Sequence, residues 1–189
     1  MTKESFISQI ITIDITSEII QKAKSFADER KKRAELEKMH TKFDDKNDNF
    51  AWELGELIFE SFLIQKGANY NRDDKRNFHD KYDFKINNKT IDVKTAEMKK
   101  NYWEDILSRF FYWDNYLPRD QYPEKKDFIV IIRYSLHTMK AYIIGYIPGS
   151  LIINFTPIVT PVAWGNTAKY PIANYVIPLK EHRNIIEII

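Results

Sequence analysis

The segment 81–96 constrains the fold of this chain most, because it has the pattern of a β-hairpin. Apolar and polar residues alternate on both sides of Asn87 and Asn88. This period of two is typical of half-buried strands, and asparagine tolerates the positive φ that a tight two-residue turn requires. Counting outwards from the turn therefore predicts both the register of the two strands and the face that each side chain takes.

The predicted hairpin has one apolar and one polar face. The apolar face carries Tyr82, Phe84, Ile86, Ile91 and Val93. The polar face carries Lys81, Asp83, Lys85, Thr90, Asp92 and Lys94. We expect the apolar face to pack on the core and the polar face to be open.

In this register Asp83 lies directly opposite Asp92 on the polar face. Two like charges with Cβ atoms about 5 Å apart destabilise a hairpin, so a compensating cation is expected. Mg²⁺ suits the place, since it takes one or two carboxylates together with waters and phosphate oxygens. Lys94 could neutralise part of the pair, hold a water or contact a phosphate. In the alternative, Asp83 is a solvated strand-end residue and Asp92 pairs with Lys94 or Lys81.

Composition excludes several classes of site. The chain has 189 residues, 43% of them hydrophobic, which is enough for a single domain with a real core. It contains no cysteine, which excludes disulfides, thiolate zinc sites and cysteine nucleophiles. Its four histidines are scattered without metal-ligand spacing: His40, His79, His137 and His182. The net charge of +2 neither requires nor opposes a nucleic-acid partner.

No stretch approaches the roughly 20 apolar residues of a membrane span. We therefore expect no membrane partner and a cytoplasmic location. The abundance of Lys, Asn and Ile suggests an AT-rich prokaryotic or phage genome. Near the N-terminus, 6–15 alternates loosely and suggests a short strand or extended arm. A helix is expected from Thr16 or Ser17, with Ser17 as a good N-cap. Beyond its apolar stripe this helix carries Arg30 and Lys31, which favour a solvated face over a phosphate contact, although both are candidate nucleic-acid contacts.

A second helix is expected over 50–65, after a loop at 44–49, with Gly67 as its C-terminal cap. Glu53, Glu56 and Glu60 follow the i, i+3, i+7 pattern and therefore share one stripe of this helix. This stripe could supply a further acidic ligand or a general base. Glu56 is the first candidate, because it follows the small Gly55, and Glu53 is a possible additional acid.

The rest of the chain alternates between loops, strands and one aromatic-rich segment. Residues 69–81 are expected to form a loop or an irregular edge, and 97–117 an aromatic-rich helix on the sheet. In that helix Lys99, Lys100, Tyr102 and Arg109 could border a nucleic-acid cleft, although core packing explains the aromatic residues equally well. The remaining expectations are a central strand buried on both faces at 127–134, a strand at 140–147, a short strand or helical turn at 151–155, a loop-rich excursion at 156–173, a closing element at 175–177 and a docked C-terminal segment at 184–189.

An acidic helix, a hairpin with Asp on its first strand and Asp-x-Lys on its second, an aromatic helix and further strands follow one another in this chain. This order resembles the PD-(D/E)xK nuclease superfamily, which has the restriction-endonuclease-like fold. The matching residues are Glu56 (or Glu53), Asp83, Asp92 and Lys94, with the surrounding sequence from Ile91 to Thr95. Tyr82 stands where the family name gives proline.

The resemblance implies an α/β fold in which helices flank a central mixed β-sheet. It divides a single domain, 1–189, into an N-terminal strand and helix extension (1–48), a catalytic core (49–147) and a loop-rich C-terminal part (148–189). It also implies a deoxyribonuclease that uses Mg²⁺, with Mn²⁺ as a substitute. Asp83, Asp92 and the Val93 carbonyl would hold the metal, Glu56 would add a ligand or orient a water, and Lys94 would position or activate the attacking water.

DNA is the substrate that the resemblance implies, cut by a restriction-type or phage-type endonuclease. A homodimer would allow both strands to be cut in one encounter. The alternative is a non-catalytic module that binds nucleic acid or protein and uses the acidic cluster only structurally.

Overall fold

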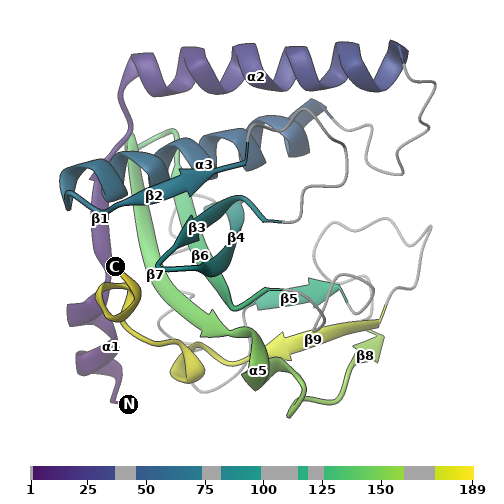
Figure 1. Cartoon of the computed structure of the whole chain (residues 1–189). Coiled ribbons are helices and arrows are strands. Elements are labelled where there is room, and N and C mark those ends of the chain that lie inside the picture. Colours follow the sequence, from purple (N-terminus) through teal and green to yellow (C-terminus); the bar gives the residue numbers. More distant parts are fainter. Residues whose placement is uncertain (1, 37–45, 74–81, 99–114, 119–125, 160–172) are drawn as a thin grey trace.

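A curled, mixed six-stranded β-sheet flanked by helices forms the centre of this α/β protein (Figure 1). The structure is a computed structural model that describes residues 2–36, 46–73, 82–98, 115–118, 126–159 and 173–189. The strand order in the large sheet is β1-β7-β6-β4-β3-β2. These strands are β1 (Ile11–Asp14), β2 (Tyr70–Arg72), β3 (Phe84–Ile86), β4 (Lys89–Glu97), β6 (Phe128–Ser135) and β7 (Lys140–Pro148). The pair β4 and β6 is parallel, and the other neighbouring pairs are antiparallel.

The predicted hairpin is confirmed in β3 and β4. Phe84 pairs with Ile91 and Ile86 with Lys89, as the count from the turn requires. Asn87 and Asn88 have φ values of 48° and 64°, the two positive values of a type I′ turn. The apolar face is buried as expected, at Phe84, Ile86, Ile91 and Val93.

The sheet has a hydrophobic core on each face, and β6 contributes to both. Val130 and Ile132 point into the core beneath the helices, whereas Ile129 and Ile131 join the core on the opposite face. This confirms the prediction of a central strand buried on both faces.

Two long helices cover one face of the sheet, and Figure 1 shows α3 (Lys46–Gln65) between α2 (Ser17–Leu36) and the strands. The end of α3 matches the prediction, because Gly67 has φ +64° and the Ala68 N–H donates to the Leu63 carbonyl, 3.0 Å away, in a Schellman cap. The helix starts at Lys46, four residues before the predicted start at 50 and within the segment 44–49 that was expected to be a loop. In α2 the helix begins at Ser17, but Thr16 provides the cap, because its Oγ1 accepts the Ile19 N–H at 3.2 Å.

Three other expectations differ from the structure in part. The short strand that was one alternative for 6–15 is present as β1, an edge strand of the central sheet, but helix α1 (Lys3–Gln9) precedes it. For 69–81 the alternative of a sheet edge is confirmed at Tyr70–Arg72, which is the edge strand β2, whereas 74–81 lies outside the described residues. The expected helix at 97–117 is wrong at both ends, because β4 continues through Glu97 along β6 and Asn115–Pro118 is strand β5, while 99–114 lies outside the described residues.

In the C-terminal part, β9 (Ala173–Ile177) and β8 (Ile158–Val159) join β5 in a second, smaller sheet with the order β5-β9-β8. The helical turn α5 (Gly149–Ile152) and the 3₁₀ turns η2 (Leu179–Glu181) and η3 (Ile185–Ile188) complete this part. The predicted docking of 184–189 on the body is confirmed by the buried Ile185 and Ile188. Among the helices in the described part of the chain, none has the length and apolar character needed to cross a membrane.

Candidate active site

Asp83 lies immediately before β3, where the ladder with β4 ends. The Asp83 N–H donates to the Ile91 carbonyl at 2.9 Å, and the Asp83 Oδ2 accepts the Val93 N–H at 2.6 Å. The last residue pair between β3 and β4 is Phe84 with Ile91. Asp83 and Asp92 are therefore not a cross-strand pair, contrary to the prediction from the sequence. The Asp83 carboxylate is instead bound to the backbone of β4.

Asp92 lies in the middle of the sheet, because β4 pairs with β3 on one side and with β6 on the other. Only 8% of the residue is exposed, so the polar face of the hairpin is not open here, in contrast to the prediction. Lys94 Nζ lies 3.0 Å from Asp92 Oδ2, and Lys126 Nζ lies 3.9 Å from Asp92 Oδ1. The alternative pairing of Asp92 with Lys94 is therefore present, and Lys126 is a second cation that the sequence did not indicate.

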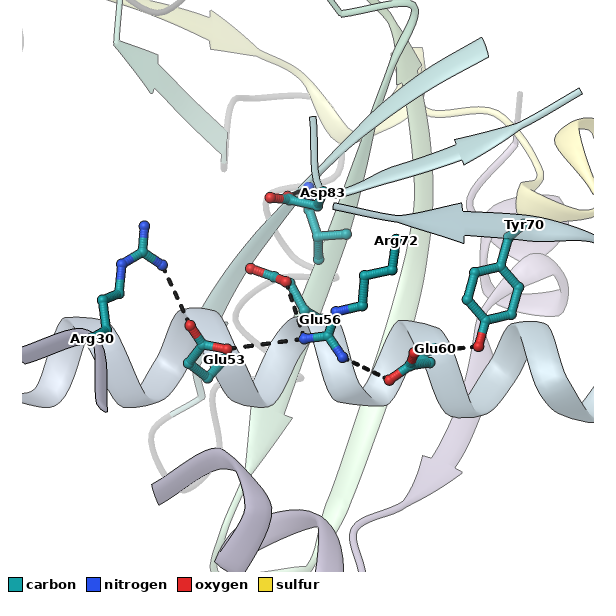
Figure 2. A network of polar contacts seen from close by, with 8 residues as sticks. Arg30, Glu53, Glu56, Glu60, Tyr70, Arg72 and Asp83 are labelled. Atoms are coloured by element: carbon teal, nitrogen blue, oxygen red, sulfur yellow. Dashed lines mark hydrogen bonds and ion pairs between the residues drawn. The ribbon is translucent and has the colours of Figure 1, made fainter. Parts of the chain in front are cut away.

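Glu56 reaches the same place from α3. Gly55 allows this close approach, because a Cβ at Gly55 would lie 1.6 Å from Thr95 Oγ1 on β4. In Figure 2 the Glu56 carboxylate points towards Asp83. Loss of hydration, followed by the nearby charges of Glu56 and Asp92, raises the pKa of Asp83 well above its ordinary value, and the Val93 N–H and Lys94 offset this only in part. The fold thus brings together the three carboxylates that the sequence singled out.

Arg72 on β2 is the counter-ion of the glutamate stripe. Its guanidinium lies 2.7 Å from Glu60, 3.3 Å from Glu56 and 3.9 Å from Glu53 (Figure 2). Tyr70, two residues earlier on the same strand, donates its hydroxyl to Glu60 at 3.2 Å. Sequence reasoning missed this network, although the spacing of Tyr70 and Arg72 places both on one face of a strand.

The side chain of Arg30 is turned inward from α2, although a solvated face was expected. Its guanidinium lies 3.4 Å from Glu53 Oε1 and 5.4 Å from the centre of the Trp52 ring. Glu53 therefore lies between Arg30 and Arg72. It precedes Glu56 by three residues, about one turn of α3, and lies further from Asp83 (Figure 2). Lys31 is partly buried. The other candidate nucleic-acid contacts, Lys99, Lys100, Tyr102 and Arg109, lie outside the described residues.

The carboxylates of this site have the chemistry that Mg²⁺ prefers in its ligands. Within the ranges that the structure describes, no three Asp, Glu or His residues are grouped closely enough to hold a metal ion by themselves. Mg²⁺ needs only one or two carboxylates, since it keeps several waters and takes substrate oxygens. Loss of hydration, followed by repulsion from Glu56 and Asp92, raises the pKa of Asp83, and a bound cation would relieve that repulsion. Asp83 and Asp92, with Glu56 beside them, therefore fit such an ion in type and charge.

Three carboxylates and three cations meet where α3, β2, β3, β4 and the start of β6 converge. They are Glu56, Asp83, Asp92, Arg72, Lys94 and Lys126. In comparisons with known proteins, no family model, no curated protein and no solved structure matches this chain. The class of site is therefore argued from its chemistry, which combines hard oxygen ligands with ammonium groups and suits an anionic oxygen substrate.

Proposed function

We propose that this protein is a metal-dependent nuclease that hydrolyses DNA phosphodiester bonds, an endonuclease of the restriction or phage kind. One observation carries the proposal: Asp83 lies where loss of hydration and then the charges of Glu56 and Asp92 raise its pKa, and Lys94 lies 3.0 Å from Asp92. The order of acidic helix, hairpin and further strands agrees with the PD-(D/E)xK superfamily that the sequence resembles. We therefore assign the restriction-endonuclease-like fold as part of the same proposal.

Each side chain has a distinct role in this mechanism. Asp83, Asp92 and the Val93 carbonyl would hold a Mg²⁺ ion, and Glu56 would add a ligand or orient a water. When bound, the ion lowers the pKa of a water and neutralises charge that grows on the phosphate. Lys94 positions the attacking water and favours its deprotonated form.

Arg72 and the backbone of β4 prepare the site. Arg72 lies 3.3 Å from Glu56 and offsets part of the cost of burying a carboxylate that is only 4% exposed. The Val93 N–H fixes one oxygen of Asp83 and leaves the orientation of the carboxylate defined. The ligands are thus held before substrate arrives, which reduces the reorganisation needed for the reaction.

The ion pairs of the site favour a second candidate from another class. Arg72 already neutralises Glu56, and Lys94 already neutralises Asp92, which is what a non-catalytic binding module with a structural acidic cluster would need. The two functions differ in their response to metal. A site that binds metal only in the folded state raises the melting temperature as Mg²⁺ or Mn²⁺ is added, whereas the module gains nothing.

The direct test is incubation of the purified protein with supercoiled plasmid, linear duplex and single-stranded DNA in Mg²⁺, Mn²⁺ or EDTA. The nuclease requires cutting in metal and none in EDTA, and the products separate nicking, sequence-specific cleavage and digestion from ends. If no DNA is cut in either metal, the binding module is the better account. Mass measurement in solution, with and without DNA, tests the proposed homodimer separately.

A further inference from the structure

We propose that Lys126 is a second cationic residue of the candidate site and that its ammonium contacts a non-bridging oxygen of the phosphodiester that is cleaved. This inference rests on the proposed nuclease function and extends it. The resemblance to the superfamily gives a role only to the lysine of the Asp-x-Lys motif, Lys94. Lys126 comes instead from the segment that leads into β6, the parallel neighbour of β4.

Each oxygen of the Asp92 carboxylate has a lysine ammonium group near it. Lys94 lies near one oxygen of that carboxylate and Lys126 near the other, at 3.0 and 3.9 Å. The side chain of Lys126 is only 14% exposed, against 34% for Lys94, so the cation of Lys126 lies deeper in the protein. A cation held at this depth requires a close anionic or polar acceptor.

The metal-binding role proposed for Asp92 affects both lysines that lie near it. If its oxygens bind a divalent cation during the reaction, their hold on both lysines weakens because the same negative charge is shared. A phosphate oxygen arriving at the site then offers Lys126 an acceptor of the right charge. Lysine binds phosphate as a compact point charge with three donors, which suits a single non-bridging oxygen.

Hydrogen bonds of the neighbouring residue fix the backbone at Lys126. The next residue, Asp127, accepts the Thr90 N–H at 2.9 Å, the Thr90 hydroxyl at 3.0 Å and the Lys89 ammonium at 3.1 Å. The Asp127 carbonyl accepts the Gly149 N–H at 2.8 Å. These bonds hold the start of β6 to the hairpin and to the end of β7.

Gly149 packs against Lys126 itself. A Cβ at Gly149 would lie 2.0 Å from the Lys126 carbonyl oxygen, so only glycine permits this approach. The backbone at Lys126 is thus held in place relative to Asp92 by contacts with the start of β4 and with Gly149, which follows β7. Such rigidity is needed to position a charge on a reacting phosphate.

The test compares Lys126→Gln with Lys140→Gln. Lys140 is a suitable control because it is also paired with an aspartate, Asp14, but at the far edge of the sheet. With Ca²⁺ in place of Mg²⁺, binding of a short DNA duplex is measured over a range of salt concentrations. The slope of log K against log salt should fall by about 1 in Lys126→Gln and stay at the wild-type value in Lys140→Gln.

The second readout is cleavage of DNA with a phosphorothioate at the scissile position. Lys126→Gln should cut the ordinary phosphate about 100-fold more slowly than wild type. One sulfur diastereomer should slow the wild type, and this effect should shrink in Lys126→Gln, a change that a purely structural lysine would not cause. If Lys126→Gln does not fold, Lys126→Arg serves instead. It should keep the salt slope and change the sulfur effect, and an unchanged sulfur effect would overturn the proposal.

The outcomes separate this inference from the function on which it rests. If wild type cuts DNA and Lys126→Gln matches Lys140→Gln in salt slope and sulfur effect, Lys126 has no phosphate contact and the nuclease proposal stands. If wild type neither binds nor cuts DNA, both proposals fail together.

Discussion

Replacement of Arg72 by methionine tests the polar network between β2 and α3. Methionine keeps an apolar side chain but removes the guanidinium, whose Cζ lies 5.7 Å from the centres of both the Phe26 and the Phe84 ring. The guanidinium then no longer compensates Glu53, Glu56 and Glu60. Removing one partner of a buried ion pair costs about 3–5 kcal/mol, because the other charge stays buried.

The exposures of the partners decide where in this range the loss falls. The side chains of Arg72 and Glu60 are 16% and 18% exposed, whereas that of Glu56 is 5% exposed. Partial access to water reduces the penalty, so we expect a loss of about 3 kcal/mol in the free energy of unfolding. For a chain of this size that lowers the melting temperature by roughly 6–12 °C.

The assay is urea and thermal unfolding at neutral pH in EDTA. Lys140→Met is the matched control, since its ion pair with Asp14 is exposed, and it should leave the unfolding midpoint unchanged. In a double-mutant cycle, Glu60→Gln should cost less in Arg72→Met than in wild type, with a coupling of about 1–3 kcal/mol. A loss below about 1 kcal/mol together with no coupling would refute the network as an energetic unit.

Three further predictions concern the packing and the titration of buried groups. Gly55→Ala should cost about 1–3 kcal/mol, because the new Cβ meets Thr95, and Thr95→Gly should restore most of it in urea unfolding. Asp83 has a folded-state pKa raised above its ordinary value of 3.8, so the folded protein binds more protons and wild type should lose stability as pH rises from about 3.8 through that raised pKa. Asp83→Asn should lack this loss in metal-free buffer, and an identical pH profile for both proteins would contradict the raised pKa. Burial, followed by the Arg133 charge, lowers the pKa of His182 from 6.5 to about 3, so stability should fall as pH drops through that interval by up to about 1.4 kcal/mol per pH unit, and His182→Leu should flatten the profile.

The features that could be predicted from sequence are those with local causes. The hairpin followed from alternation and from two asparagines whose positive φ values the structure contains. The end of α3 followed from an apolar stripe and Gly67. The stripe of Glu53, Glu56 and Glu60 followed from helical spacing alone.

The features that could not be predicted depend on distant partners. β4 runs to Glu97 because β6, some forty positions away, pairs with it. Similarly, Asn115–Pro118 is strand β5 because it pairs with β9, although the sequence pattern predicted a helix through these residues. Arg72 and Lys126 occupy polar stretches without periodicity, and only the folded chain brings them to Glu56 and Asp92.

The nuclease active site that we propose consists of Glu56, Asp83, Asp92 and Lys94. The most direct measurement is the rate of plasmid cleavage in Mn²⁺ by wild type, Asp92→Ala, Lys94→Ala and the exposed control Lys140→Gln, each first shown to be folded. We predict that Lys140→Gln cuts at the wild-type rate and that Asp92→Ala and Lys94→Ala do not cut. Wild-type cutting by folded Asp92→Ala or Lys94→Ala would contradict the assignment of this site.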